Sequence, residues 1–163
     1  MNILNQTCLR VIIVMMVAIS LCSCQSQSVN EGKEKPRAEY FLLRPELEKT
    51  YGYTQAVKVG NILKIGGVIS IDDKGMLVGK SDYAQQMSNC YASLERVLKH
   101  YGCTFDDVVL ENIYTTSIQE LQQHAAYRTK IYTKHFPTGS WIGVKELGLP
   151  DAMIEIEMEV LVP

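Results

Sequence analysis

The stretch FPTGSWIGV (residues 136–144) and the stretch LPDAMIEIE (residues 149–157) decide the fold of this chain. Together they predict a strand, a short connection and a second strand. In the second stretch Glu155 and Glu157 alternate with apolar residues, so both carboxylates lie on one face of the strand and the apolar side chains on the other. This pattern is typical of a half-buried strand with a solvated acidic face, and it also suits a strand that presents carboxylates to a ligand.

The residues upstream predict an N-terminal strand and a hairpin. Residues 39–43 form a plausible first strand, residues 55–59 alternate, and residues 62–71 return after a Gly-Asn turn. The pair Gly66-Gly67 interrupts the returning strand. Paired glycines in a strand mark a bulge or a close approach to the backbone, either by a ligand or by a neighbouring part of the sheet.

A first helix and a further strand are predicted after the hairpin. The helix begins at Ser81 or Asp82 and reaches Tyr101, because apolar residues recur at three- and four-residue spacing along it. Gly102 then suits a left-handed C-cap. A strand follows over residues 107–116, which are rich in Val, Ile and Tyr.

A capping box, Ser117-x-x-Glu120, opens a second predicted helix that runs to about His135. The resulting order of elements is β β β α β α β β. It predicts an α+β fold in which a single-layer mixed sheet of about five or six strands has two helices packed on one face.

Composition limits the class of protein. The chain has 163 residues, a formal net charge of −2 and no basic cluster, which fits one globular domain and argues against a nucleic-acid partner. No spacing of Cys and His matches a metal site. Cys90 lies inside the first predicted helix and is expected in the core, whereas Cys103 follows it as a loop thiol. The helix between them, roughly 16 Å long, is too long for a disulfide.

The N-terminal residues predict a secretion signal and a lipid anchor. An apolar run follows Arg10, and Leu21-Cys22-Ser23-Cys24 then resembles a bacterial lipobox with Cys24 as the acceptor. A plain signal peptide in which Cys24 is incidental has the same pattern. The predicted organisation is a lipoprotein signal peptide, a flexible tether and a folded domain: residues 1–23, 24–37 and 38–163. The domain would then meet the membrane only through its lipid anchor, at the cell envelope (the outer membrane or the periplasmic face in a Gram-negative bacterium).

Several ordered segments give the chain a resemblance to a known family. They are YTQAVKVGN (53–61), the Gly66-Gly67 pair, HYG (100–102), FDDVV (105–109) and LPDAMIEIE (149–157). From about Tyr53 to Val160 the sequence resembles the Rid family (YjgF/YER057c/UK114), whose best-known members are enamine/imine deaminases. The resemblance implies a chorismate-mutase-like fold and a homotrimer with small-molecule clefts between adjacent subunits, and it calls for no cofactor.

The resemblance also implies three site residues. Tyr53 matches a cleft tyrosine that contacts the substrate, Gly67 a glycine whose backbone approaches the ligand, and Glu157 a glutamate that positions the hydrolytic water. Water attack on an imine carbon needs an acceptor for a proton, which a partly desolvated carboxylate supplies. Tyr53 could equally be a packing aromatic with its hydroxyl in solvent.

The chain departs from the deaminating members of the family at four matched positions. Gly139 stands where those members carry an Arg that binds the substrate carboxylate, and Trp141 stands in place of a cysteine. Gly66 replaces a cleft serine, and Ala125 replaces a helix asparagine. Because the loss of a charge-assisted pair of hydrogen bonds weakens binding by roughly a hundredfold or more, a 2-imino-acid deaminase of the usual kind is not expected.

Other residues are candidates for the ligand site. Ser140 lies between Gly139 and Trp141, whose indole offers a flat apolar wall. Arg128 and Lys145 could reach a cleft from another direction, although Arg128 also suits an exposed position on a helix.

Two functions follow from these patterns. The first is hydrolysis (deamination) of a small reactive enamine or imine at an inter-subunit cleft, with Glu157 and Tyr53 as the catalytic residues. The second is a non-catalytic, lipid-anchored trimer that binds a small ligand or a partner protein at the cell envelope. Glu157 discriminates between them, because an enzyme needs its carboxylate and a binding protein does not.

Overall fold

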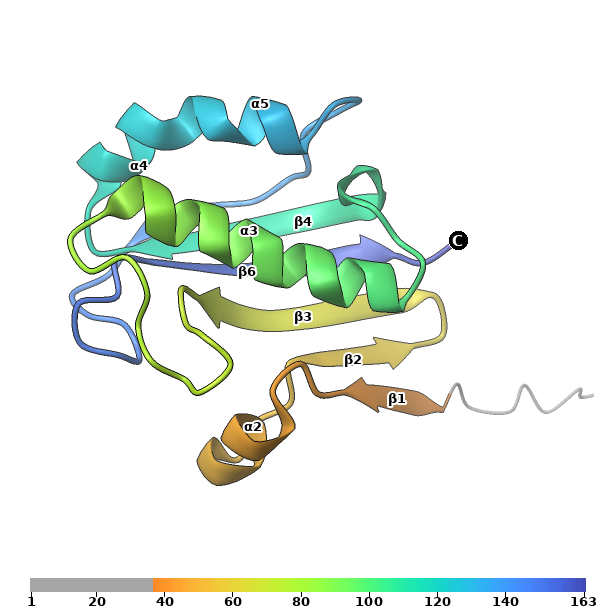
Figure 1. The fold of residues 1–163 in the computed structure, drawn as a ribbon. Coiled ribbons are helices and arrows are strands. Elements are labelled where there is room, and N and C mark those ends of the chain that lie inside the picture. Colours follow the sequence, from red (N-terminus) through yellow and green to blue (C-terminus); the bar gives the residue numbers. More distant parts are fainter. Residues whose placement is uncertain (1–36) are drawn as a thin grey trace, which may run out of the picture. The chain divides into compact units, whose positions relative to one another are not determined.

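Six strands form one mixed sheet in the order β1-β2-β3-β6-β4-β5 (Figure 1). The computed structural model describes residues 37–163. The strands are β1 (Ala38–Phe41), β2 (Ala56–Val59), β3 (Ile62–Ile69), β4 (Val108–Thr115), β5 (Trp141–Gly143) and β6 (Ile154–Leu161). Neighbouring strands are antiparallel except β4 and β5, which are parallel. The mixed sheet and its strands are therefore confirmed.

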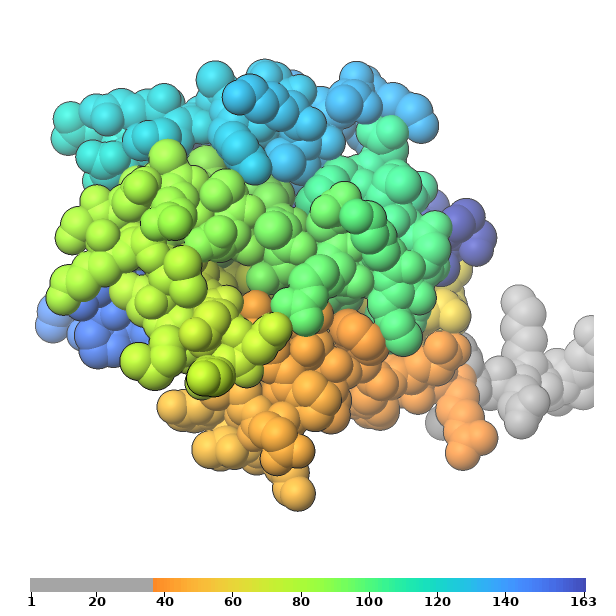
Figure 2. All heavy atoms as spheres, in the orientation of Figure 1, coloured from red at the N-terminus to blue at the C-terminus, as the bar shows by residue number. Residues whose placement is uncertain are grey.

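The helices are α2 (Pro45–Tyr51), α3 (Tyr83–His100), α4 (Ile118–His124) and α5 (Arg128–Ile131), with 3₁₀ turns at Phe105–Asp107 and Ala125–Tyr127. Helix α3 packs on β3 and β6, and α4 packs on α3 and β5. Figure 2 shows α3, α4, α5 and the loops beside them over the upper and middle part of this side of the molecule, with the orange residues of β1 and α2 below them. Helix α2 instead lies near the β1–β2 edge of the sheet (Figure 1).

The second predicted helix is shorter and less regular than expected. Its capping residue is confirmed, because the Ser117 hydroxyl accepts a hydrogen bond from the backbone N–H of Glu120 at 3.2 Å. The helix changes to a 3₁₀ turn at Ala125–Tyr127 and ends at Ile131, before His135. It ends there because Tyr132 takes an extended conformation, and the Tyr132 hydroxyl donates to the buried Glu111 carboxylate at 2.6 Å.

The core lies between the sheet and α3. The apolar side chains that β3, β6 and α3 contribute are almost fully buried: Leu63, Ile65, Val68, Ile154, Ile156, Met158, Leu94, Val97 and Leu98. Each such side chain stabilises the fold by roughly 1.5–3 kcal/mol relative to an exposed one. The alternation of β6 is confirmed, since its even-numbered residues face the core and Glu155, Glu157 and Glu159 are half-buried on the other face.

Helix α3 ends in a Schellman motif, as Gly102 predicts. Gly102 has a φ of +68°, and the backbone N–H of Cys103 donates to the Leu98 carbonyl at 2.9 Å. This turn folds Cys103 back onto the core, so its thiol is buried rather than presented by a loop. Cys90 is fully buried, and both cysteines are free.

The predicted signal peptide, Cys24 and nearly all of the predicted tether lie outside the described residues. Within residues 37–163, none of the helices combines the length and the apolar character that crossing a membrane requires.

Candidate functional site

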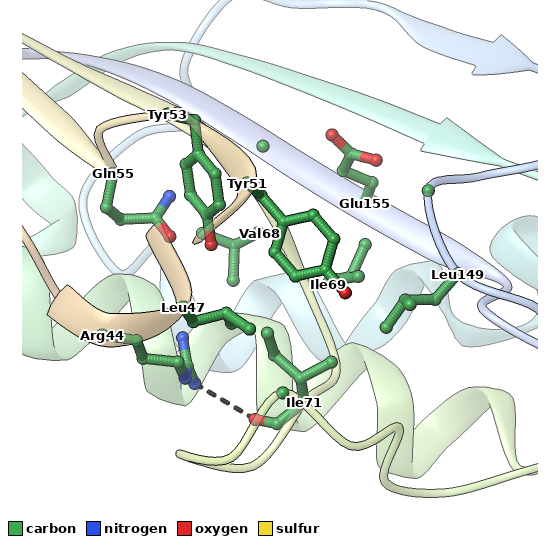
Figure 3. Close-up of a pocket in the computed structure, with 13 residues that line it drawn as sticks. Arg44, Leu47, Tyr51, Tyr53, Gln55, Val68, Ile69, Ile71, Leu149 and Glu155 are labelled. Carbon is green, nitrogen blue, oxygen red and sulfur yellow. Dashed lines mark hydrogen bonds between the residues drawn. The ribbon is translucent and has the colours of Figure 1, made fainter. Parts of the chain in front are cut away.

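A cavity of about 200 Å³ lies between α2, the C-terminal half of β3 and the start of β6 (Figure 3). Residues from these elements and from the loop before β6 line it, among them Arg44, Leu47, Tyr51, Tyr53, Gly67 and Glu155. The cavity therefore brings together two of the predicted site residues, Tyr53 and Gly67.

Glu48 of α2 fixes the chain on one side of the cavity. Its side chain is fully buried, and its two carboxylate oxygens accept the backbone N–H groups of Arg44 and Gln55. Helix α2 then ends at Gly52, whose φ of +71° lets the backbone N–H of Tyr53 donate to the Glu48 carbonyl at 3.0 Å. A buried carboxylate thus sets the positions of Arg44, Tyr53 and Gln55.

The paired glycines form the predicted bulge. The register between β3 and β6 shifts between Ile65 and Val68. The backbone N–H of Gly66 donates to the Gln55 carbonyl at 2.8 Å, and the Gln55 side chain donates to the Gly66 carbonyl at 2.9 Å. At Gly67 the close approach is made by Glu155, because a Cβ there would overlap the Glu155 carboxylate and lie 2.7 Å from its Cδ.

Burial changes the acidity of two groups in this cavity. Burial, followed by the nearby charge of Glu157, raises the pKa of the Glu155 carboxyl above its ordinary value. Burial, followed by the charge of Glu48, likewise raises the pKa of the Tyr53 hydroxyl. A carboxyl group with a raised pKa can take up and return a proton closer to neutral pH than an exposed one.

Arg44 supplies a cation to the same cavity. Its side chain is only 5% exposed, and its guanidinium donates to the carbonyls of Ile71 and Asp72 and to the hydroxyl of Ser93, each at 3.1 Å. Burial, followed by the charge of Arg96, lowers the pKa of Arg44. The sequence offered no pattern that marks Arg44, since an Arg before Pro45 is an ordinary entry to a short helix.

Glu157 does not line the cavity of Tyr53 and Gly67. Its Oε1 accepts hydrogen bonds from the Asn112 side chain and the Tyr114 hydroxyl, both at 2.9 Å. It lies in a second hollow, of about 310 Å³, farther along the half-buried face of β6, which Lys64 also lines. The alternation of β6 correctly predicts that Glu155 and Glu157 lie on one face of the strand. However, it is Glu155, and not Glu157, that lines the same cavity as Tyr53.

Residues 139–141 run beside β4, where the backbone N–H of Ile113 donates to the Ser140 carbonyl, and they do not line the cavity. The backbone N–H of Ser140 donates to the Asn112 side chain at 3.0 Å, and Trp141 begins the edge strand β5 with 39% of its surface exposed. A Cβ on Gly139 would overlap the carbonyl oxygen of Glu111. An Arg at position 139 is therefore incompatible with this backbone.

Arg128 lies on the helix-covered face of the sheet, away from the cavity. It pairs with the buried Glu111, which also accepts hydrogen bonds from the hydroxyls of Tyr91 and Tyr132 at 2.7 and 2.6 Å. Its guanidinium carbon lies 5.9 Å from the Trp141 ring centroid. Arg128 thus faces neither solvent nor the cavity, because the buried Glu111 carboxylate needs a cation.

No cluster of His, Cys, Asp and Glu suited to a metal ion occurs within residues 37–163.

Comparison with known proteins places this chain in a family. The family model described as Endoribonuclease L-PSP matches residues 44–162. A RutC family protein of Saccharolobus solfataricus is 31% identical over 104 residues, which cover 64% of this chain and 82% of the relative. A 2-iminobutanoate/2-iminopropanoate deaminase of Dermatophagoides farinae is 26% identical over 110 residues, which cover 68% of this chain and 85% of the relative.

Solved structures agree with this assignment. A member of the YjgF/YER057c/UK114 family from Mycobacterium tuberculosis has a TM-score of 0.66 at 26% identity, over 77% of this chain and all of that one. A Rid family protein of unknown function from Yersinia pestis has a TM-score of 0.63 at 29% identity, over 68% of this chain and 87% of that one. The chain therefore belongs to the Rid (YjgF/YER057c/UK114) family.

Proposed function

We propose that the cavity hydrolyses the C=N bond of a small imine, or of the enamine that tautomerises to it, with Glu155 activating the water. One observation carries this proposal: the Glu155 carboxylate, whose pKa is raised, lies against Gly67 in the cavity that Tyr53 lines. The similarity to a 2-iminobutanoate/2-iminopropanoate deaminase supports the same reaction class.

The chemistry needs one group that first accepts and then returns a proton. Water adds to the carbon of the protonated imine while the Glu155 carboxylate takes a proton from the water, and a neutral carbinolamine forms. The carboxyl group then returns this proton to the nitrogen and the C–N bond breaks, which releases ammonia. The hydroxyl proton passes to the Glu155 carboxylate as the carbon becomes a carbonyl, and it is then released to solvent. A positioned carboxylate of this kind contributes roughly 10²–10⁴-fold to the rate.

The other cavity residues would hold the substrate. Tyr53 lines the cavity with 39% of its surface exposed, and its hydroxyl has a raised pKa, so it stays protonated and can donate a hydrogen bond at neutral pH. Leu47, Val68 and Ile69 provide apolar surface, which suits a small aliphatic substrate.

A non-catalytic binding protein is the second candidate. Gly139 favours it, because the backbone there leaves no room for the Arg that the deaminating members carry. In either case we propose a homotrimer attached to the cell envelope through Cys24. The net charge of −2 gives no support to an RNA substrate.

The test is the decay of imines in the presence of the purified protein. Imines would be generated in solution from acidic, neutral and aromatic amino acids, and ammonia release would be followed with and without the protein. We expect faster decay for at least one small aliphatic imine. Equal decay for every imine, from protein shown to be folded, would contradict the proposed hydrolysis and favour the binding function.

A further inference from the structure

We propose that Arg44 is the anion-binding group of this cavity and selects a small ligand that carries a carboxylate. This inference deepens the proposed function, because it names the class of its substrate. Figure 3 shows Arg44 and Glu155 on opposite sides of the lining residues.

The guanidinium of Arg44 is held rigidly. Its Nε donates to the Asp72 carbonyl, and its Nη2 donates to the Ile71 carbonyl and to the Ser93 hydroxyl, each at 3.1 Å. These three hydrogen bonds use the Nε–H and both hydrogens of Nη2. A fixed guanidinium loses little conformational entropy when it binds a ligand, so its remaining donors form a prepared site.

Those remaining donors belong to Nη1. Within residues 37–163, Nη1 has no hydrogen-bond acceptor, and it is not fully buried. Because Arg44 is 95% buried by side-chain area and lines the cavity, we infer that Nη1 is accessible from the cavity. Two N–H donors are then available to a ligand.

The positive charge of Arg44 is also poorly compensated. The three acceptors that hold it are neutral, and the Glu48 oxygens accept backbone N–H groups instead. The nearest carboxylate, Asp73, is 3.6 Å from Nε, is 74% exposed, and also pairs with Arg96. A buried cation gains most from an anion that enters its own low-dielectric surroundings.

The cavity therefore offers a cation at one end and the Glu155 carboxyl at the other. A ligand with a carboxylate and a nearby C=N or carbonyl carbon matches both ends. A volume of about 200 Å³ suits a small ligand. Arg44, which directly precedes α2, thus supplies a cation to the cavity, whereas Gly139 has no side chain that could do so.

The test compares ligands that differ only in charge. Binding of pyruvate, pyruvamide and inorganic phosphate to the wild-type protein would be measured by calorimetry. We expect pyruvate to bind at least roughly tenfold more tightly than pyruvamide, because hydrogen bonds to a charged partner are stronger. Equal affinity for pyruvate and pyruvamide, or tighter binding of phosphate, would overturn the proposal.

Variants locate the effect at Arg44. The R44Q substitution removes the charge and should abolish the preference for pyruvate, whereas R96Q removes an exposed charge beside the same Asp73 and should preserve it. A preference that persists in folded R44Q would overturn the proposal. If R44Q does not fold, the comparison of pyruvate with pyruvamide on the wild-type protein still tests the proposal.

The outcomes also separate this inference from the proposed hydrolysis. Tight pyruvate binding without turnover of any imine would contradict the hydrolysis and support the role of Arg44. Turnover of an imine in the decay assay, together with equal affinity for pyruvate and pyruvamide, would support the hydrolysis and overturn the role of Arg44.

Discussion

The Glu155 carboxylate occupies the space that a side chain at position 67 would need. A Cβ on Gly67 would overlap this carboxylate and lie 2.7 Å from its Cδ, so the two residues can share the cavity only while position 67 is glycine. The neighbouring Gly66 is different, since a Cβ there would meet nothing closer than the Gln55 carbonyl oxygen at 3.6 Å.

The substitution Gly67→Ala should therefore displace Glu155 without unfolding the protein, because the obstacle is the end of a flexible side chain. We expect imine hydrolysis to fall by at least roughly tenfold, as expected when a general base is misplaced. Gly66→Ala is the matched control and should retain most of the activity. If both variants hydrolyse imines as fast as the wild type, the Glu155 position does not matter for the reaction.

Glu155 also makes the stability of the fold depend on pH. Its pKa is raised in the folded state, so the folded protein binds more protons than the unfolded chain between the ordinary Glu pKa of about 4.3 and the raised value. Stability is therefore lost as pH rises through this window. Glu155→Gln should raise the melting temperature near neutral pH, and this gain should disappear below about pH 4.

Thermal melts of the wild type and Glu155→Gln across this pH range show whether the substitution raises or lowers the melting temperature at each pH. A melting temperature for Glu155→Gln that is lower than wild type at neutral pH, with no change toward acidic pH, would show that the Glu155 carboxylate is stabilised rather than strained in the folded state.

Glu48 is predicted to be a structural residue on which the cavity depends. A Gln at this position can accept only one of the two backbone N–H groups that the Glu48 oxygens accept now, and its amide N–H₂ would face the other. We expect Glu48→Gln to lower the free energy of unfolding by about 1–3 kcal/mol in urea titrations. Glu46→Gln, an exposed change on the same helix, should be nearly neutral, and equal effects of the two would contradict this role.

The substitution Gly139→Arg should not restore the carboxylate-binding Arg of the deaminating members. The obstacle here is backbone, because a Cβ would overlap the carbonyl oxygen of Glu111 and lie 2.7 Å from its carbonyl carbon. We expect a large loss of stability in thermal melts. Ser140→Arg, at an exposed neighbouring position, should be tolerated. A stable Gly139→Arg protein with increased turnover of 2-imino acids would mean that this segment can move.

Much of the fold could be predicted from the sequence, because its strands alternate and α3 carries a continuous apolar stripe. The short helix α2 was missed, since seven residues are too few for a helical period, although Pro45 at its start and Gly52 after its end are the usual signals. The end of the second helix was misplaced because Tyr132 leaves the helix to reach Glu111, a long-range contact that local pattern does not contain.

The candidate site, like the fold, could be predicted from the sequence only in part. Alternation along β6 placed Glu155 and Glu157 on one face, but it could not tell which of them meets Tyr53. That choice depends on the bulge at Gly66-Gly67, which shifts the register of β3 against β6. Register is a property of the paired strands, so one strand read by itself does not reveal it.

The most direct test of the proposed hydrolysis compares Glu155→Gln with Glu157→Gln in the imine-decay assay. Both changes remove one carboxylate from the same face of β6, but only Glu155 lines the cavity with Tyr53 and Gly67. We predict that Glu155→Gln lowers the acceleration by roughly 10²-fold or more and that Glu157→Gln leaves most of it. Full activity in Glu155→Gln, or loss only in Glu157→Gln, would contradict the assignment of Glu155.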